Sequence, residues 1–368
     1  MAARHVRALS AFLLIVALFP STGRATEANS TLLGSCKDVA VPVSLAEGLP
    51  RDYTVRGRLC LPRGRTPTTV QLLLHGATYR GIYWDFPYQP ERYSYVRALV
   101  ADGYATLDID RLGFGSSSHP LSPLVTMETG AHAIHQVIQA ARNGTLGVRF
   151  DRVIVVGHSH GTVIAWREAA AYHDIDGLIA TGNTHRVSPT TGLNIALHLY
   201  PASMDPQFAN SGLDPGYLTS RPGFRGVFYR EADADPNVIT TDEATKDTVS
   251  LLDLFPTYQL ELFDGDSSKI HVPVLIAVGR YDRLMCSRFA SNCSSASTLL
   301  ADERFFYSGT SCLEAYVLPG AGHDMNLHLN APDFFTVAAR WSDRWIGSSP
   351  STNNDPSRCV RGIGGLAS

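Results

Sequence analysis

One serine in this sequence stands between two glycines, where a strand-like pattern changes to a helix-like pattern. The stretch 152–166 reads RVIVVGHSHGTVIAW, a β-branched run followed by Gly-His-Ser-His-Gly and then a helical run. A tight strand-to-helix turn needs small residues two positions before and after the serine, so that the hydroxyl stands clear. Such a turn also places Ser159 at a helix N-terminus, where backbone N–H groups favour developing negative charge. The pattern predicts a nucleophilic serine, and the alternative is a purely structural glycine turn.

A serine hydroxyl is a poor nucleophile until a base takes its proton. The neighbours His158 and His160 cannot easily fold back onto Ser159 within so sharp a turn. We therefore expect His158 to pack beside the turn and His160 to contribute its backbone N–H to an oxyanion hole. The predicted base is His323, which lies on the glycine-rich loop PGAGH after the last predicted strand.

An acid is needed to orient that histidine, and it should follow a strand at the same edge of the sheet. Asp282 lies three residues past the strand-like run VLIAVG and fits this position. Asp324 is adjacent to His323 in sequence and is expected to point elsewhere. Asp264 and Asp266 fall in a less regular region and are weaker candidates. The predicted set is Ser159, Asp282 and His323.

The residues that position this set form strand patterns alternating with helix patterns. Predicted strands are 53–62, 68–76, 104–110, 152–157, 177–183, 272–279 and 314–320. Predicted helices are 91–103, 127–141, 161–173 and 331–346. Strands alternating with helices indicate an α/β fold with a mostly parallel, doubly wound sheet that is covered on both faces.

The alternation breaks between the strand at 177–183 and the strand at 272–279. Residues 184–270 are too many for a plain connection, and apolar clusters such as LNIALHLY argue against a disordered linker. We predict that they form a partly helical lid insertion. The α/β core then covers 53–183 and 271–346, with an N-terminal extension at 26–52 and a polar tail at 347–368.

The first 25 residues differ in kind from the rest. A basic start (MAARHVR), an apolar run (ALSAFLLIVALF) and a small-residue exit (PSTGRA) are typical of a secretory signal peptide, with cleavage after Ala25. The apolar run is short for a membrane span, and no other stretch is apolar enough to form one. An uncleaved anchor is the alternative. We expect a secreted protein without a stable membrane span after signal cleavage.

Composition excludes several classes of function. The 368 residues carry a formal net charge of −3, so no basic field indicates a nucleic-acid partner.

The six cysteines of an exported chain indicate disulfides. Pairing the cysteines so that the nearest loops are closed gives Cys36–Cys60, Cys286–Cys293 and Cys312–Cys359. No Cys-x-x-Cys is present, and His132 and His135, three apart on a helix, are interpreted as surface or core histidines without a carboxylate or cysteine partner placed for a metal. No metal is therefore predicted.

The order Ser159, Asp282, His323 on this frame resembles the α/β-hydrolase superfamily, in particular its serine-nucleophile, single-lid members that are similar to esterases and lipases. LLLHGATYRG resembles the turn that carries an oxyanion donor, which implies the backbone N–H of Ala77. DIDRLGFGSSS resembles a glycine-rich loop of the same members. The resemblance implies an eight-stranded core, acyl transfer and no cofactor. No His-Gly-Gly-Gly run is present, and the nucleophile is serine rather than aspartate.

Two questions stay open at this point. Tyr79, Tyr83 and Trp84 follow the oxyanion turn, and they either line the substrate pocket or pack the loop against the core. The predicted function is a secreted serine hydrolase that cleaves a small-molecule or lipid-like carboxylic ester. Alternatives are an amidase, peptidase or thioesterase with the same residues, or a binding protein on a hydrolase fold that has lost catalysis.

Overall fold

A computed structural model describes residues 34–254 and 265–349. The predicted signal peptide at 1–25 and Cys359 lie outside the described residues, so these two predictions are not addressed by the structure. Within the described ranges, no helix combines the length and the apolar character that a bilayer span requires.

An eight-stranded sheet forms the centre of the fold, in the order β1-β2-β4-β3-β5-β6-β10-β11. The strands are β1 (Ser35–Val43), β2 (Tyr53–Leu61), β3 (Thr69–Leu74), β4 (Ala105–Asp110), β5 (Arg152–His158), β6 (Gly177–Thr181), β10 (Val274–Gly279) and β11 (Glu314–Leu318). β2 is antiparallel to both β1 and β4, and all other neighbours are parallel. The predicted fold class, a mostly parallel eight-stranded α/β sheet, is confirmed.

The edge strand β1 comes from the segment that the sequence assigned to an N-terminal extension. It pairs with β2 over its full length, and Cys36 lies opposite Cys60 in the register. The Cys36–Cys60 disulfide is present, as is Cys286–Cys293, so both of these predicted pairs are confirmed. The sequence missed β1 because an edge strand is half exposed and carries Pro42, which weakens the strand pattern.

Both faces of the sheet are covered, which explains the continuous apolar runs of the central strands. In β5, Val153 and Val155 pack into the cluster beneath α4 (Met127–Asn143) and α5 (His160–Tyr172). The alternate residues of β5 pack into the cluster beneath α3 (Tyr95–Ala101) and α11 (Ala331–Trp345). Burial of each such side chain contributes about 1.5–3 kcal/mol. Two further helices are α2 (Pro90–Tyr93) and α10 (Ala296–Glu303).

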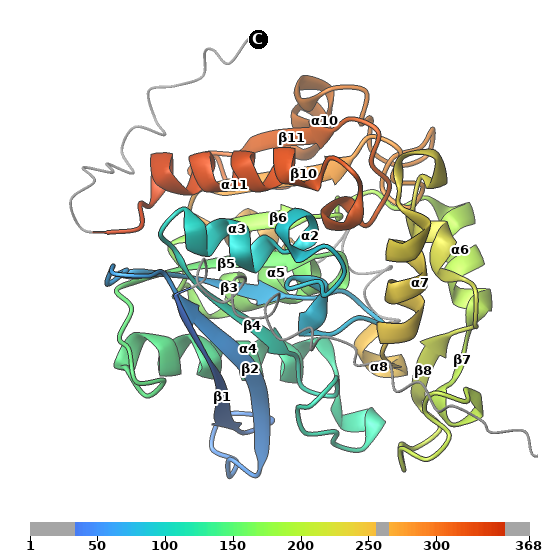
Figure 1. Cartoon of the computed structure of the whole chain (residues 1–368), viewed down its shortest axis with the longest axis horizontal. Coiled ribbons are helices and arrows are strands. Elements are labelled where there is room, and N and C mark those ends of the chain that lie inside the picture. The colour runs from blue at the N-terminus through green and yellow to red at the C-terminus, as the bar shows by residue number, and fades with distance from the viewer. Residues whose placement is uncertain (1–33, 255–264, 350–368) are drawn as a thin grey trace, which may run out of the picture. The chain divides into compact units, whose positions relative to one another are not determined.

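The predicted insertion contains more than helices. It holds α6 (Pro189–His198), α7 (Pro236–Thr245) and α8 (Leu251–Leu254), together with a separate antiparallel sheet of β7 (Leu199–Pro201), β8 (Tyr217–Ser220) and β9 (Val249–Ser250). Figure 1 shows α6, α7, β7 and β8 gathered beside one end of the main sheet. The small sheet was not predicted, because its strands are only two to four residues long.

Candidate active site

Ser159 lies at the turn between β5 and α5 in a backbone conformation that few side chains adopt, with φ 53° and ψ −123°. Both flanking glycines are required by close packing. A Cβ on Gly157 would lie 2.6 Å from Thr162 Cα, and one on Gly161 would lie 2.4 Å from the carbonyl oxygen of Leu74. The backbone of α5 at Gly157 and that of β3 at Gly161 therefore leave room only for glycine, and the turn exposes the serine hydroxyl.

The three side chains singled out in the sequence lie in one hydrogen-bonded chain. His323 Nε2 lies 2.9 Å from Ser159 Oγ, and His323 Nδ1 lies 2.8 Å from Asp282 Oδ2. Asp282 is fully buried, and its other oxygen accepts hydrogen bonds from the backbone N–H groups of Leu284 (2.9 Å) and Met285 (3.0 Å). These two backbone hydrogen bonds fix the orientation of the carboxylate whose other oxygen faces the imidazole.

This environment changes how readily His323 takes up a proton. Burial by itself lowers the pKa of an imidazole, since it disfavours the charged form. The charge and hydrogen bond of Asp282 oppose burial, Asp324 adds to their effect, and the pKa of His323 is raised above its ordinary value of 6.5. The side chain is therefore a stronger base than a free histidine, while its Nε2 remains next to the serine hydroxyl.

The loop that carries His323 is braced by a second buried histidine. His328 Nε2 accepts hydrogen bonds from the backbone N–H groups of Gly322 (2.9 Å) and Arg230 (3.1 Å), and its Nδ1 donates to the carbonyl oxygen of Asp324 (2.9 Å). Burial lowers the pKa of His328, which keeps Nε2 available as an acceptor. The sequence carried no signal for this role, since one of the two donors, Arg230, comes from a distant segment.

A small apolar cavity of about 30 Å³ lies beside Ser159 and His323. Its lining is Ala77, Thr78, Tyr79, Ser159, Ile195, Leu199, Ser220, Phe224, Phe228, Leu254, Leu284 and His323. Many of these side chains come from the insertion, so residues of the segment predicted as a lid cover the serine.

The two residues expected to donate backbone N–H groups both lie at this site. Ala77 lines the cavity, and His160 opens α5 directly after Ser159. The imidazole of His160 contacts the insertion instead, with Nε2 3.0 Å from Asp253 Oδ2. This contact with α8 directs the imidazole away from the serine hydroxyl. The arrangement agrees with the expectation that the backbone N–H of His160, and not its ring, contributes to the site.

The aromatic residues after the oxyanion turn divide between cavity and core. Tyr79 lines the cavity. Tyr83 and Trp84, assigned to the substrate pocket as one of two alternatives, do not line this cavity, which favours the second alternative, that they pack the loop against the core. The ring of Tyr83 stacks on the buried ring of His158 at 4.4 Å between centroids, and Trp84 packs against Tyr95. Both are core residues because the chain turns into a 3₁₀ helix (Gly81–Tyr83) that points them inward.

A buried charge pair from the insertion holds the turn next to Ala77. Arg225 donates two hydrogen bonds to the carboxylate of Asp242, at 2.8 and 3.1 Å, and a third to Thr78 Oγ1 at 2.8 Å. The backbone N–H of Asp247 donates to the carbonyl oxygen of Thr78 at 2.9 Å. Thr78 has φ 60°, an unfavourable conformation for a β-branched residue. The insertion thus stabilises this strained turn, a role that the sequence did not reveal.

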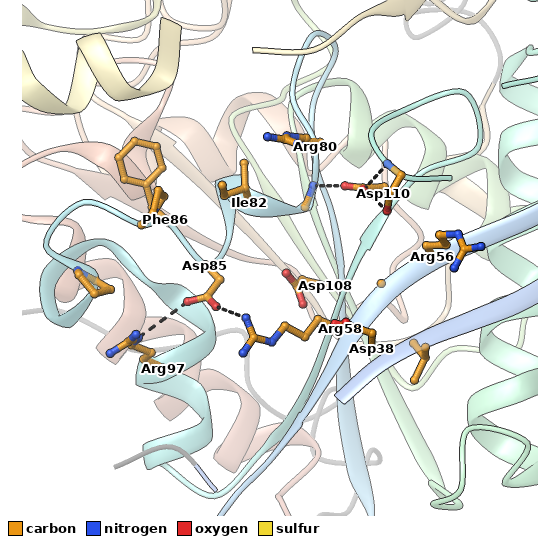
Figure 2. A pocket seen from close by; sticks show the side chains of 16 residues that line it. Asp38, Arg56, Arg58, Arg80, Ile82, Asp85, Phe86, Arg97, Asp108 and Asp110 are labelled. Atoms are coloured by element: carbon orange, nitrogen blue, oxygen red, sulfur yellow. Dashed lines mark hydrogen bonds and ion pairs between the residues drawn. The ribbon is translucent and has the colours of Figure 1, made fainter. Parts of the chain in front are cut away.

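A larger hollow among the described residues lies elsewhere and is lined by many charged side chains. This cleft of about 710 Å³ is lined by four arginines and four aspartates, namely Arg56, Arg58, Arg80, Arg97, Asp38, Asp85, Asp108 and Asp110. Figure 2 shows Asp85 between two of these arginines and Asp110 bound to the backbone N–H of Gly81. Neither Ser159 nor His323 lines this cleft. The candidate active site is therefore at the smaller cavity, although the cleft has the larger volume.

The chain resembles proteins of known family over most of its length. The model of the Alpha/beta hydrolase family matches residues 71–338. A putative non-heme chloroperoxidase of Synechocystis sp. is 24% identical over 229 residues, which are 58% of this chain and 74% of that protein.

Solved structures with low sequence identity to this chain share its fold. A monoacylglycerol lipase of Paleococcus ferrophilus covers 83% of this chain and 98% of its own, with 17% identity and a TM-score of 0.52. A bromoperoxidase of Bacillus anthracis covers 83% and 99%, with 18% identity and a TM-score of 0.54. These likenesses show a shared fold. With the family match spanning more than half of the sequence, the chain belongs to the α/β-hydrolase family.

Proposed function

We propose that this protein is a secreted serine hydrolase that cleaves carboxylic esters through an acyl-enzyme. The observation that carries the proposal is the continuous hydrogen-bonded chain from Ser159 Oγ through His323 to Asp282. Its order and distances are those of a nucleophile, a base and the acid that orients the base. Family membership and the esterase and lipase names among the structural neighbours agree with it.

The proposed reaction begins when His323 Nε2 takes the proton of Ser159 and the serine oxygen attacks the ester carbonyl. The carbonyl oxygen becomes negative, and the backbone N–H groups of Ala77 and His160 stabilise it. The proton on His323 then passes to the leaving alcohol as the ester C–O bond breaks. Water, activated by the same imidazole, attacks the acyl-enzyme, releases the acid and returns the proton to Ser159.

The cavity favours apolar acyl groups. Apart from Thr78, Ser220 and the proposed catalytic side chains, its walls are aliphatic or aromatic. A volume of about 30 Å³ is comparable to that of one water molecule, so a substrate enters only when side chains of the insertion move. We therefore propose short-chain or flexible apolar esters, with amides and thioesters as the substrates to be tested against them.

A fluorophosphonate probe tests the proposal directly. The probe should label the wild-type protein on Ser159, and the label should vanish in Ser159→Ala. Ser220→Ala is a matched control, since this second serine lines the same cavity without belonging to the hydrogen-bonded chain. Labelling of Ser159→Ala would refute the assignment. Absence of both labelling and ester turnover in the wild type would favour a binding protein.

The raised pKa of His323 predicts the pH profile. Below its pKa the imidazole is protonated and cannot take the serine proton, so kcat/KM for a short ester should rise with pH, with a midpoint above 6.5. Asp282 and Asp324 raise this midpoint, and burial and Arg225 lower it. Chromatographic measurement of the released acid between about pH 5 and 8 checks the prediction, and a flat profile over this range contradicts it.

A further inference from the structure

A buried carboxyl group outside the candidate active site lies beside a second carboxyl group and a histidine. Glu168, in the second half of α5, is fully buried. Neither of its side-chain oxygens makes a hydrogen bond within the part of the chain that the structure describes. The ordinary expectation is that a buried carboxylate is paired, hydrogen-bonded or bound to a metal. Burial and the neighbouring Asp174 raise the pKa of Glu168 well above its ordinary value, so this carboxyl group keeps its proton unless a bound cation displaces it.

Two potential metal ligands face this carboxylate from neighbouring segments. His135 on α4 has Nδ1 at 3.9 Å from Glu168 Oε1 and at 2.8 Å from Asp174 Oδ2. Asp174, just beyond α5, has its other oxygen buried without a hydrogen-bond partner among the described residues. The three ligand atoms all lie within 4.8 Å of one another, and no other such group occurs in the described ranges.

The spacing is suitable for one ion. Zinc binds nitrogen at about 2.0–2.1 Å and carboxylate oxygen at about 2.0–2.2 Å, so in tetrahedral coordination its ligand atoms lie about 3.4 Å apart. The distances from His135 Nδ1 to Glu168 (3.9 Å) and to Asp174 (2.8 Å) lie on either side of this value, so small side-chain shifts would accommodate the ion. A divalent cation would replace the proton that burial and Asp174 favour on Glu168, and it would neutralise the two carboxylates that result. Imidazole with carboxylates suits Zn²⁺ and similar transition metals better than Mg²⁺ or Ca²⁺.

Among the described residues, the surroundings engage only one of the two Asp174 carboxylate oxygens, Oδ2, which is hydrogen-bonded to Gln139 and to His135. Gln139 donates to Asp174 Oδ2 at 2.7 Å, and the guanidinium of Arg142 binds the backbone carbonyl of Asp174 rather than its carboxylate. The ring of His135 stacks on Tyr172 at 3.9 Å between centroids. His135 remains about a quarter exposed, which leaves a path for an ion from solvent.

We propose that His135, Glu168 and Asp174 form a binding site for a divalent transition-metal ion of the Zn²⁺ class. The site would join α4, α5 and the segment after α5. Glu168 follows Ser159 by nine residues on the same helix, roughly 13 Å along its axis, so the ion would act on stability and not on the proposed chemistry. The sequence did not predict it, because Glu168 and Asp174 lie over thirty positions from His135 and meet it only in the fold.

Zinc binding by the full chain, stripped with EDTA and then dialysed against Zn²⁺, tests the proposal. Wild type should bind one zinc per chain, and zinc should raise its thermal unfolding midpoint. Glu168→Gln and His135→Ala should each weaken binding at least about tenfold and abolish the shift. His132→Gln is the matched control, since His132 lies one turn away on α4, where Tyr172 and Ser44 are its partners.

Each other outcome overturns the site. If His132→Gln loses zinc while Glu168→Gln keeps it, a surface histidine pair binds the ion and the proposed ligand set is wrong. If wild type binds no zinc, Glu168 and Asp174 share a proton instead of a metal. Unfolding midpoints measured in EDTA show whether each variant still folds, so loss of binding is not confused with loss of structure. The result is independent of whether Ser159 is a nucleophile.

Discussion

Replacing Asp282 with asparagine is expected to lower kcat for ester hydrolysis about 10⁴-fold while leaving the fold intact. Asparagine can still accept the hydrogen bonds from Leu284 and Met285 through its side-chain oxygen. Its amide nitrogen, however, donates a hydrogen bond where the carboxylate accepts one. His323 must then present an unprotonated Nδ1 to residue 282, and the remaining proton moves to Nε2. An imidazole protonated at Nε2 cannot take the proton of Ser159.

Steady-state kinetics on a short ester, together with the rate of fluorophosphonate labelling, measure this effect. Asp302→Asn is a suitable control, because this partly exposed aspartate contacts Asn292 and Arg186 and not His323. The control should retain wild-type kcat. A loss of less than about tenfold in Asp282→Asn would mean that His323 is oriented by another group, and the proposed role of Asp282 would be wrong.

The parts of this site that could be predicted from sequence are those encoded by neighbouring residues. The glycines two positions before and after Ser159 indicate the turn, and the close approach of α5 to Gly157 and of β3 to Gly161 explains why both are needed. His323 and Asp282 each follow a strand pattern at the same edge of the sheet. Parallel strands bring such positions together regardless of the sequence between them, so long-range proximity followed from local patterns.

The parts that could not be predicted depend on pairings without a local signature. Tyr83 and Trp84 are equally compatible with a pocket wall and a core, and only the direction of the chain after Gly81 decides between them. Arg225 and Asp242 are ordinary charged residues in an irregular segment. Nothing in their neighbourhood indicates that both become fully buried behind Tyr79, where the guanidinium lies 3.8 Å from the centre of that ring.

This buried pair leads to the second large expected effect. Asp242→Ala should lower the free energy of unfolding by about 3–5 kcal/mol, because it leaves the guanidinium of Arg225 buried without its carboxylate. Tyr229 loses its hydrogen-bond acceptor in the same variant, which adds to the cost. Urea unfolding monitored by tryptophan fluorescence measures the change. Glu314→Ala is the matched control, since its partner Arg344 is nearly half exposed and such pairs contribute about 0–1 kcal/mol.

A double variant distinguishes the effect of the buried charges on stability from the effect of this pair on the geometry of the turn at Thr78. Arg225→Met with Asp242→Leu removes both charges and should recover most of the stability, as replacement of buried ion pairs by apolar residues commonly does. It cannot restore the hydrogen bond to Thr78, whose positive φ then lacks one of its two supports. We therefore expect kcat to stay reduced with little change in KM, since Ala77 precedes Thr78 and its proposed N–H contact would form only with the oxyanion. Full recovery of kcat together with stability would show that the insertion contributes to folding but does not position the oxyanion turn.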